Sequence, residues 1–297
     1  MKLSILPPSI KKALFAVISL LLLLISLPAA SPLALTTAGI WGWQSNTESG
    51  FDLPILLYHS LLRDTSKSGA YTITPSQFEA DLLYLCENGY QTILPSQLVA
   101  YVEKGVPLPE KPVMITFDDG YYNNYFYGFP LLEQYGMQAV ISIVGSFSEQ
   151  SAKLDERNPN FSYLVWADIQ AMEKSGRIEF ANHTYDMHRI NGARSGSAKG
   201  KGETQEVYAR HFTADIGLLQ EKFFAVLGHE SMVFAYPFGS ISQESKTLLP
   251  SLGFNVTLTS TQGINQIRRG DPSCLLLLKR NNRPAHMSTA AFFKGLQ

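Results

Sequence analysis

Short apolar runs of strand length alternate with longer helical segments along this chain, and that alternation constrains the fold more than any other feature. Strands and helices in strict alternation form right-handed βαβ units, whose strands build a parallel sheet. Seven such runs in one domain favour a barrel over an open sheet. The predicted fold class is therefore α/β, with a barrel-like parallel sheet. The expected strands are residues 54–58, 112–117, 139–144, 178–181, 232–236, 255–259 and 274–279.

Helix start and stop signals lie between these runs. Thr74 is a good N-cap residue, the following Pro75 suits the first helical position, and Gly89 suits a helix end. The expected helices are residues 74–88, 125–135, 166–175, 205–227 and 243–251.

The N-terminal segment has the pattern of a targeting sequence. Three lysines precede an apolar stretch at residues 13–30, which directs the rest of the chain across a membrane. The stretch is long enough that residues 1–38 are either a signal peptide or an uncleaved membrane anchor. Residues 39–52 are rich in Gly, Ser, Asn and Thr and are expected to be a linker, followed by one catalytic domain at 53–297. The domain is expected to work outside the cytoplasm, secreted or anchored.

Composition excludes some function classes. The 24 Lys and Arg against 25 Asp and Glu give a net charge of −1, so no electrostatic footprint for nucleic acid is present. The two cysteines, Cys86 and Cys274, lie in apolar contexts. We expect buried free thiols rather than a disulfide, although an oxidising location permits one.

One long loop, residues 189–203, is rich in Gly, Ser and basic residues. We expect it to be a solvated flexible loop. The alternative is a basic rim beside a site, which attracts an anionic polymer.

Polar residues follow the ends of several predicted strands. They are His59, residues 118–120, residues 182–184, residues 237–239 and Arg280. Because the site of a parallel α/β barrel lies at the C-terminal ends of its strands, these side chains are expected to meet at one face.

Two of these groups together indicate a metal site. Asp118 and Asp119 are adjacent carboxylates, which repel one another unless a positive group such as a divalent metal lies beside them, and His183 and His188 follow another strand. An Asp-Asp-Gly turn alone is a weak signal. Two histidines and a carboxylate suit zinc, and cobalt, manganese, nickel or iron take the same ligands. With the second carboxylate as a general base, these residues are typical of metal-assisted hydrolysis.

Three motifs in this set resemble those of a known family. The sequence TFDDG occupies residues 116–120, a His-x₄-His motif occupies 183–188, and AYPFG occupies 235–239. Together they resemble the polysaccharide deacetylases with a NodB-homology domain, carbohydrate esterase family 4, over residues 54–283. The longer second motif is similar to the branch of exopolysaccharide and poly-N-acetylglucosamine deacetylases. The resemblance implies a distorted (β/α)7 barrel of the NodB type.

The resemblance also implies roles for individual residues. It makes Asp118 the general base, and its metal ligands are Asp119, His183 and His188. Phe238 is implied as a backbone donor to the oxyanion. The expected substrate-binding residues are Tyr236 and Pro237 in the groove wall and Tyr121 among the aromatic residues near the mouth.

The chain departs from the family pattern in two places. Ala235 stands where many members have an arginine that steadies the base, which leaves the tuning of Asp118 unexplained. The fourth and fifth motifs are not found, so the usual general-acid histidine is missing. We expect His59, at the end of the first strand, to serve as the acid, with His286 as a weaker substitute.

The leading hypothesis is a metal-dependent hydrolase that removes N-acetyl groups from amino sugars of an extracellular polysaccharide, such as peptidoglycan or poly-N-acetylglucosamine. One alternative is a catalytically weak glycan-binding protein that kept the metal site. Another is an O-acetyl esterase or small-molecule amide hydrolase on the same barrel. The expected partners are an N-acetylated glycan and, if the N-terminal segment is uncleaved, the membrane. Nucleic acid is not expected, and the sequence does not predict an oligomeric state.

Overall fold

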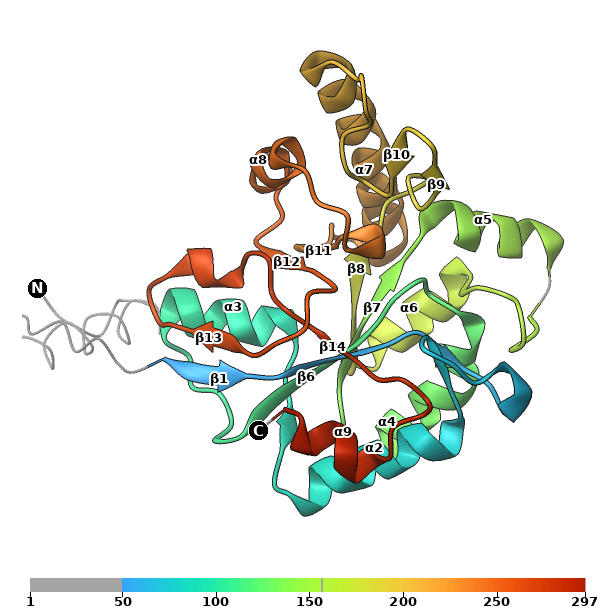
Figure 1. Cartoon of the computed structure of the whole chain (residues 1–297), viewed down its shortest axis with the longest axis vertical. Helices are drawn as coiled ribbons and strands as arrows, with labels where there is room; N and C mark the ends of the chain where they lie inside the picture. Colours follow the sequence, from blue (N-terminus) through green and yellow to red (C-terminus); the bar gives the residue numbers. More distant parts are fainter. Residues whose placement is uncertain (1–49, 156, 297) are drawn as a thin grey trace, which may run out of the picture. The chain divides into compact units, whose positions relative to one another are not determined.

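The computed structural model describes residues 50–155 and 157–296 (Figure 1). The expected signal or anchor segment at 1–38 lies outside the described residues, as does most of the expected linker. The last residues of that linker belong to the domain, because β1 (Phe51–Leu53) pairs antiparallel with β13 (Asn265–Ile267). No helix in the described ranges is both long and apolar enough to cross a membrane.

The centre of the described chain is an eight-stranded sheet in which every pair is parallel. Seven strands follow the order β12-β11-β8-β7-β6-β2-β14, and β5 pairs with β6 off this path. Their bounds are β2 (Ile55–Tyr58), β5 (Gln91–Thr92), β6 (Pro112–Phe117), β7 (Ala139–Ile143), β8 (Ile178–Asn182), β11 (Val233–Ala235), β12 (Val256–Leu258) and β14 (Asn281–Asn282). The sheet is curled into a half-barrel, which confirms the predicted α/β fold, and six expected strands lie within one residue of an observed one at each end.

The seventh expected strand, at 274–279, is wrong. This apolar run begins in a short 3₁₀ helix, η5 (Pro272–Leu275), and Leu277 has a left-handed φ of 59°, which breaks an extended run. Leu278 makes only a single parallel bridge to Leu258 of the edge strand β12. The strand that pairs with β2 is β14, just after the run. The segment from Leu278 to β14 therefore links the two edges of the curled sheet.

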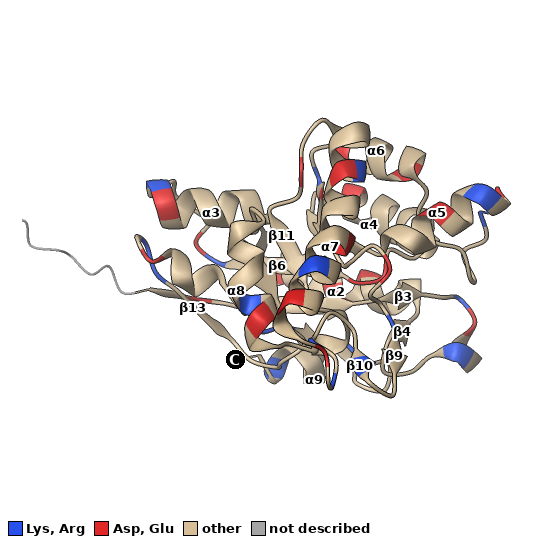
Figure 2. Ribbon diagram, turned by 90° about the horizontal axis from the view of Figure 1, so that it is seen from above, with Lys and Arg blue, Asp and Glu red and all other residues tan. Residues whose placement is uncertain are grey.

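Helices cover the outside of the sheet (Figure 1). They are α2 (Pro75–Glu87), α3 (Pro95–Lys104), α4 (Phe129–Gln134), α5 (Gly145–Leu154), α6 (Trp166–Lys174), α7 (Gln205–Leu227), α8 (Gln243–Ser251) and α9 (Thr289–Lys294). The expected helix at 125–135 is a π-helical turn, η3 (Asn124–Gly128), running into α4. Three helices, α3, α5 and α9, were not predicted from the sequence. In Figure 2 the Lys, Arg, Asp and Glu residues lie mostly on these outer helices and on loops.

The two faces of the sheet strands pack differently. On the outer face, Leu56 and Ile115 belong to a buried cluster with Phe78 of α2. On the inner face, Ile55 and Met114 belong to a second cluster that fills the half-barrel. Because side chains alternate along a strand, the inner face continues to the residues at the strand ends. The core thus points those end residues into the mouth of the half-barrel.

The segment expected to be a flexible loop holds a short hairpin, β9 (Ile190–Asn191) with β10 (Arg194–Ser195). Gly196 follows it with a left-handed φ of 53°, and a Cβ there would lie 2.6 Å from the carbonyl oxygen of Pro237. The Ser195 and Ser240 hydroxyls are also 2.6 Å apart. The hairpin is therefore fixed against the segment that follows β11.

Both cysteines are free, as expected. Cys86 is exposed and Cys274 is half-buried, so the expectation of two buried thiols is wrong. Leu82 and Leu85 lie on the inward face of α2, whereas Cys86 lies on its outer face.

Candidate active site

A cavity of about 530 Å³ opens at the C-terminal ends of the parallel strands. The structure brings most of the predicted residues to its wall. Those lining it are His59, Asp118, Asp119, Tyr121, His183, His188, Tyr236 and Phe238. Pro237 is buried behind the wall rather than on it. His286 is also absent from the described lining, which leaves His59 as the cavity histidine outside the metal cluster.

Asp119, His183 and His188 form a cluster able to hold a metal ion, with one ligand atom from each within 4.8 Å of the others. The Nε2 atoms of His188 and His183 lie 3.1 Å and 3.7 Å from Asp119 Oδ1. One carboxylate and two imidazoles form a donor set that suits zinc and other divalent first-row metals. The residues present therefore fit the metal that the sequence predicts.

Hydrogen bonding prepares His183 for this role. Its Nδ1–H donates a 2.8 Å hydrogen bond to the carbonyl oxygen of Ala235, which leaves Nε2 as the unprotonated ligand atom. Burial lowers the pKa of His183, which favours the neutral ring that a metal needs. The next residue, Thr184, has a left-handed φ of 74°, and its N–H donates to the Asn182 side chain. The turn after β8 is thus held in one shape.

The Asp-Asp-Gly turn after β6 is similarly constrained. Asp119 and Gly120 have left-handed φ values of 71° and 69°. Such a conformation is strained for most residues but is tolerated by Asp and Gly. A Cβ on Gly120 would lie 2.9 Å from a methyl carbon of Ile143 in β7, so only glycine fits there. This turn sends the two adjacent carboxylates to different places in the site.

Asp118 pairs with a buried arginine that the sequence analysis did not assign. The Arg280 guanidinium donates two parallel hydrogen bonds to the Asp118 carboxylate, each 2.7 Å long. Its Nε donates to the Thr259 carbonyl oxygen at 2.7 Å. Arg280 thereby supplies the support that Ala235 lacks, from the residue just before β14. The observable sequence signal was an arginine at the end of the expected strand 274–279, two residues after a run of leucines.

The charge state of Asp118 follows from these neighbours. Burial acts to raise the pKa of Asp118, but the Arg280 guanidinium and the nearby His183 hold that pKa well below its ordinary value. Asp118 is therefore a carboxylate at neutral pH, as a general base must be.

His59 lies at the end of β2 in the same cavity. Its ring contacts Tyr71 with centroids 4.8 Å apart, and its carbonyl oxygen accepts a 2.8 Å hydrogen bond from Asn124 Nδ2. Burial lowers the pKa of His59, while the carboxylates of Asp118 and Asp119 oppose that change. The His59 ring is thus held in the cavity, where it interacts electrostatically with Asp118 and with the metal-cluster residues Asp119 and His188.

Aromatic residues form the rim. Phe238 is 46% exposed, has a left-handed φ of 56°, and packs against His188 with ring centroids 4.4 Å apart. Tyr121 stacks on Tyr163 at 5.1 Å, and burial together with the nearby Asp119 carboxylate raises its pKa. Tyr71 is 63% exposed and was not predicted. Exposed rings around a polar cavity suit the faces of sugar rings.

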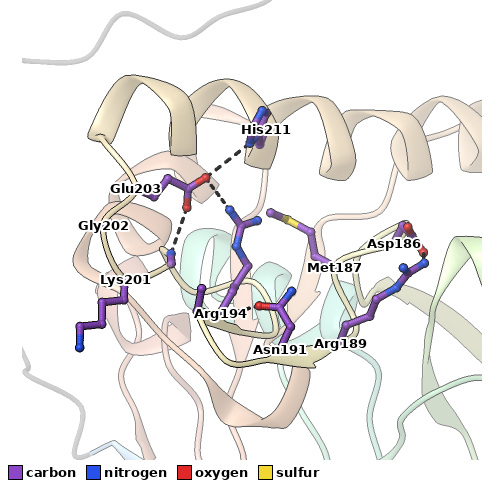
Figure 3. Close-up of a pocket in the computed structure, with 11 residues that line it drawn as sticks. Asp186, Met187, Arg189, Asn191, Arg194, Lys201, Gly202, Glu203 and His211 are labelled. Atoms are coloured by element: carbon purple, nitrogen blue, oxygen red, sulfur yellow. Dashed lines mark hydrogen bonds and ion pairs between the residues drawn. The ribbon is translucent and has the colours of Figure 1, made fainter.

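A second cavity, of about 460 Å³, lies on the other side of the β9–β10 hairpin (Figure 3). Its charged groups largely pair with one another. Glu203 accepts from Arg194 Nη2 at 2.5 Å and lies 3.4 Å from His211 Nδ1, and Asp186 pairs with Arg189. Arg189 and Arg194 of this loop are therefore each paired with a nearby carboxylate.

Comparison with known proteins bears on this geometry. The family model described as polysaccharide deacetylase matches residues 105–257. The chain belongs to the polysaccharide deacetylase family. This confirms the resemblance read from the motifs and the predicted enzyme class, a hydrolase. The match includes the metal cluster and Asp118, whereas His59 and Arg280 lie outside it.

Individual relatives of the deacetylase agree with this assignment. It is 28% identical over 218 residues to the polysaccharide deacetylase YxkH of Bacillus subtilis, covering 73% of this chain and 67% of the relative. It is 25% identical over 242 residues to the poly-β-1,6-N-acetyl-D-glucosamine N-deacetylase of Escherichia coli K12, covering 75% of this chain but only 36% of that longer protein. A solved de-N-acetylase from Aggregatibacter actinomycetemcomitans shares the fold, with a TM-score of 0.71, 22% identity, and coverage of 83% of this chain and 100% of that one.

Proposed function

We propose that the chain is a metal-dependent deacetylase that removes N-acetyl groups from amino sugars of an extracellular polysaccharide, of the poly-N-acetylglucosamine or peptidoglycan type. The observation that carries the proposal is one cavity that holds both the Asp119–His183–His188 cluster and the Asp118–Arg280 pair. The E. coli relative, named for poly-β-1,6-N-acetyl-D-glucosamine, supports this substrate class. The lysines and apolar stretch at the N-terminus support action outside the cytoplasm, secreted or membrane-anchored.

Asp119, His183 and His188 would hold the metal, with zinc the first expectation. A bound divalent metal supplies a Lewis acid, which lowers the pKa of a water and polarises a carbonyl group. His183 is held in the ligating tautomer by Ala235, and His188 is held by the Phe238 ring. These contacts keep the ligands in place without the metal, so little reorganisation is needed on binding.

The protein groups divide the proton transfers between them. Water attacks the acetamide carbonyl carbon, and Asp118 accepts the proton that the water loses. The C–N bond then breaks, and His59 donates a proton to the departing amine nitrogen, so acetate and a free amino sugar leave. Arg280 keeps Asp118 ionised before the attack and holds it in place by two hydrogen bonds. The backbone N–H of Phe238, which lies on a left-handed turn at the cavity, would stabilise the oxyanion.

Acetate release tests this proposal. The full-length chain is assayed on β-1,6- and β-1,4-linked N-acetylglucosamine oligomers and on peptidoglycan, with added zinc or cobalt. Asp118→Asn is expected to lower kcat by about 10²- to 10⁴-fold, the usual contribution of a general base. Asp155→Asn is the matched control, because Asp155 is exposed at the end of α5.

The expected result is release that requires metal, is abolished by a chelator and returns on adding metal back. Glycan binding without acetate from any substrate would overturn the proposal in favour of a binding protein. Acetate from O-acetylated glycans alone would make the chain an esterase instead.

A further inference from the structure

Two buried polar atoms in the catalytic cavity lack a hydrogen-bond partner among the described residues. They are Nδ1 of His59 and Oδ1 of Asn282, and both residues line the cavity. Buried polar side-chain atoms are nearly always hydrogen-bonded, so each such exception calls for an explanation. The two atoms are complementary, because a protonated Nδ1 is a donor and an amide oxygen is an acceptor.

The strand register brings these residues together. Asn282 of β14 lies opposite Leu57 of β2 in the parallel ladder, and His59 is two residues beyond Leu57. Residues two apart in a strand point to the same face, so Asn282, Leu57 and His59 share the inner face of adjacent strands. Arg280, two residues before Asn282, points to that face as well, since it reaches Asp118.

Other contacts fix both side chains. The Asn282 Nδ2 donates to the Ala70 carbonyl oxygen at 2.7 Å, which defines the amide orientation. The His59 backbone is held by Asn124 and its ring by Tyr71. No direct hydrogen bond joins His59 Nδ1 to Asn282 Oδ1, and a bridging water joins two fixed polar atoms at little loss of strength.

We propose that Asn282 is a positioning residue for His59. Its Oδ1 accepts the Nδ1–H of His59 through one bridging water, and this leaves Nε2 as the nitrogen that delivers the proton to the amine. The inference rests on the proposed function, because it takes His59 as the acid. An amide is a neutral partner, so it orients the imidazolium without the added charge of a carboxylate. The charged and titratable groups acting on His59 are then Asp118, Asp119, Arg280 and His188.

The test compares Asn282→Ala with Asn282→Asp in the full-length metal-loaded chain, with an N-acetylglucosamine oligomer as substrate. Asn282→Ala is expected to lower kcat about 10-fold or more, with little change in KM, as for other partners that orient a reactive histidine. The alkaline limb of the pH–rate profile shifts to lower pH, because the imidazolium loses an acceptor. Asn282→Asp keeps the acceptor and adds charge, so kcat is restored and the limb shifts to higher pH.

Two comparisons separate a positioning role of Asn282 from a structural one. Asn282→Asp also loses the hydrogen bond that Asn282 Nδ2 donates to the Ala70 carbonyl oxygen. If Asn282 had a purely structural role, both variants would therefore lose the same share of kcat, and the alkaline limb of the pH–rate profile would not move. Asn281→Ala is the matched control, because Asn281 bonds the Ile55 and Gly263 carbonyl oxygens instead. It is expected to lower stability and leave the limb in place.

The double variant His59→Ala/Asn282→Ala is expected to be no slower than His59→Ala alone, since Asn282 acts only through His59. Additive losses, or an unmoved limb in both Asn282 variants, would overturn the inference while acetate release by the wild type leaves the proposed function standing. A wild type that releases no acetate from any glycan would remove both.

Discussion

Two buried aspartates, Asp118 and Asp81, each pair with an arginine from the same short stretch of chain, but only Asp118 reaches the catalytic cavity. Arg280 holds Asp118 with two 2.7 Å bonds, and Arg283 holds Asp81 with bonds of 2.8 Å and 3.2 Å. The two arginines are three residues apart around β14, so their side chains point to opposite faces of the sheet. The same chemistry thus serves the site on one face and the scaffold on the other.

The neighbours of each pair decide its role. Asp81 of α2 also accepts from Thr289 at 2.7 Å and Tyr58 at 3.2 Å, so it joins α2, β2 and the start of α9. Burial raises the pKa of Asp81. Asp118 has His183 and His59 nearby in addition to its arginine, and its pKa is lowered. A buried ion pair can take part in catalysis only where one of its groups lines an open cavity beside other titratable groups, as Asp118 of the Asp118–Arg280 pair does.

The largest expected effect comes from breaking the pair in the site. Arg280→Ala leaves Asp118 buried without its cation, so the pKa of Asp118 rises and the acid limb of the kcat/KM profile moves to higher pH. At pH 7 we expect kcat/KM to fall by about 100-fold or more, a large part of what a general base contributes. A pH–rate profile measures this. Arg280→Lys keeps the positive charge but cannot make the two parallel hydrogen bonds. Its kcat/KM at pH 7 is expected to lie between those of the wild type and Arg280→Ala. An acid limb that stays in place in Arg280→Ala would contradict the assignment.

Breaking the second pair, Arg283–Asp81, is expected to lower the stability of the fold but not the activity. Arg283→Ala leaves Asp81 as an uncompensated buried charge, which lowers the free energy of unfolding by about 3–5 kcal/mol. Because Asp81 faces away from the cavity, kcat per folded molecule is expected to stay unchanged. Urea unfolding and acetate release on the same samples measure the two quantities. If kcat fell as far as in Arg280→Ala at equal folded fraction, the division of roles between the faces would be wrong.

The half of the site that sequence predicted is the half carried by short contiguous motifs. Asp118 and Asp119 share one turn, as do His183 and His188, so their chemistry can be read without knowing which strands are neighbours. The metal cluster followed from these motifs, and the α/β fold followed from the alternation of apolar runs and helical segments. The other half depends on β14 pairing with β2 across more than two hundred residues of sequence. Arg280 was expected at the same face, but its pairing with Asp118 was not, because the left-handed Leu277 ends the expected strand and β14 begins only after the leucine run.

The contribution of the Asp118–Arg280 pair to the stability of the fold is expected to depend on pH. The pKa of Asp118 is lower in the folded chain than its value of about 3.9 in an unfolded chain. The pair therefore stabilises the fold above about pH 4, and this contribution is lost as the pH falls through the folded pKa. The stability gap between wild type and Arg280→Ala is thus expected to narrow from pH 7 to pH 3. Urea unfolding at several pH values, with a chelator present so that metal binding does not contribute, measures the gap. A gap that widens in acid would mean the pKa of Asp118 is raised instead.

The smallest effect is expected at a third Arg–Asp pair, Arg189–Asp186, on the rim of the second cavity (Figure 3). Its side chains are 67% and 43% exposed, so water screens both charges. Arg189→Ala is expected to change the free energy of unfolding by less than about 1 kcal/mol. Activity on short oligomers is expected to stay at the wild-type level, since the β9–β10 hairpin keeps its contacts with Pro237 and Ser240. Activity on a long polymer is the sharper measurement. If Arg189→Ala lowered kcat/KM for the polymer but not for short oligomers, the second cavity would hold a distant part of the glycan. The solvent exposure of an Arg–Asp pair would then not show whether the pair has a functional role. Its distance from the bound glycan would decide that instead.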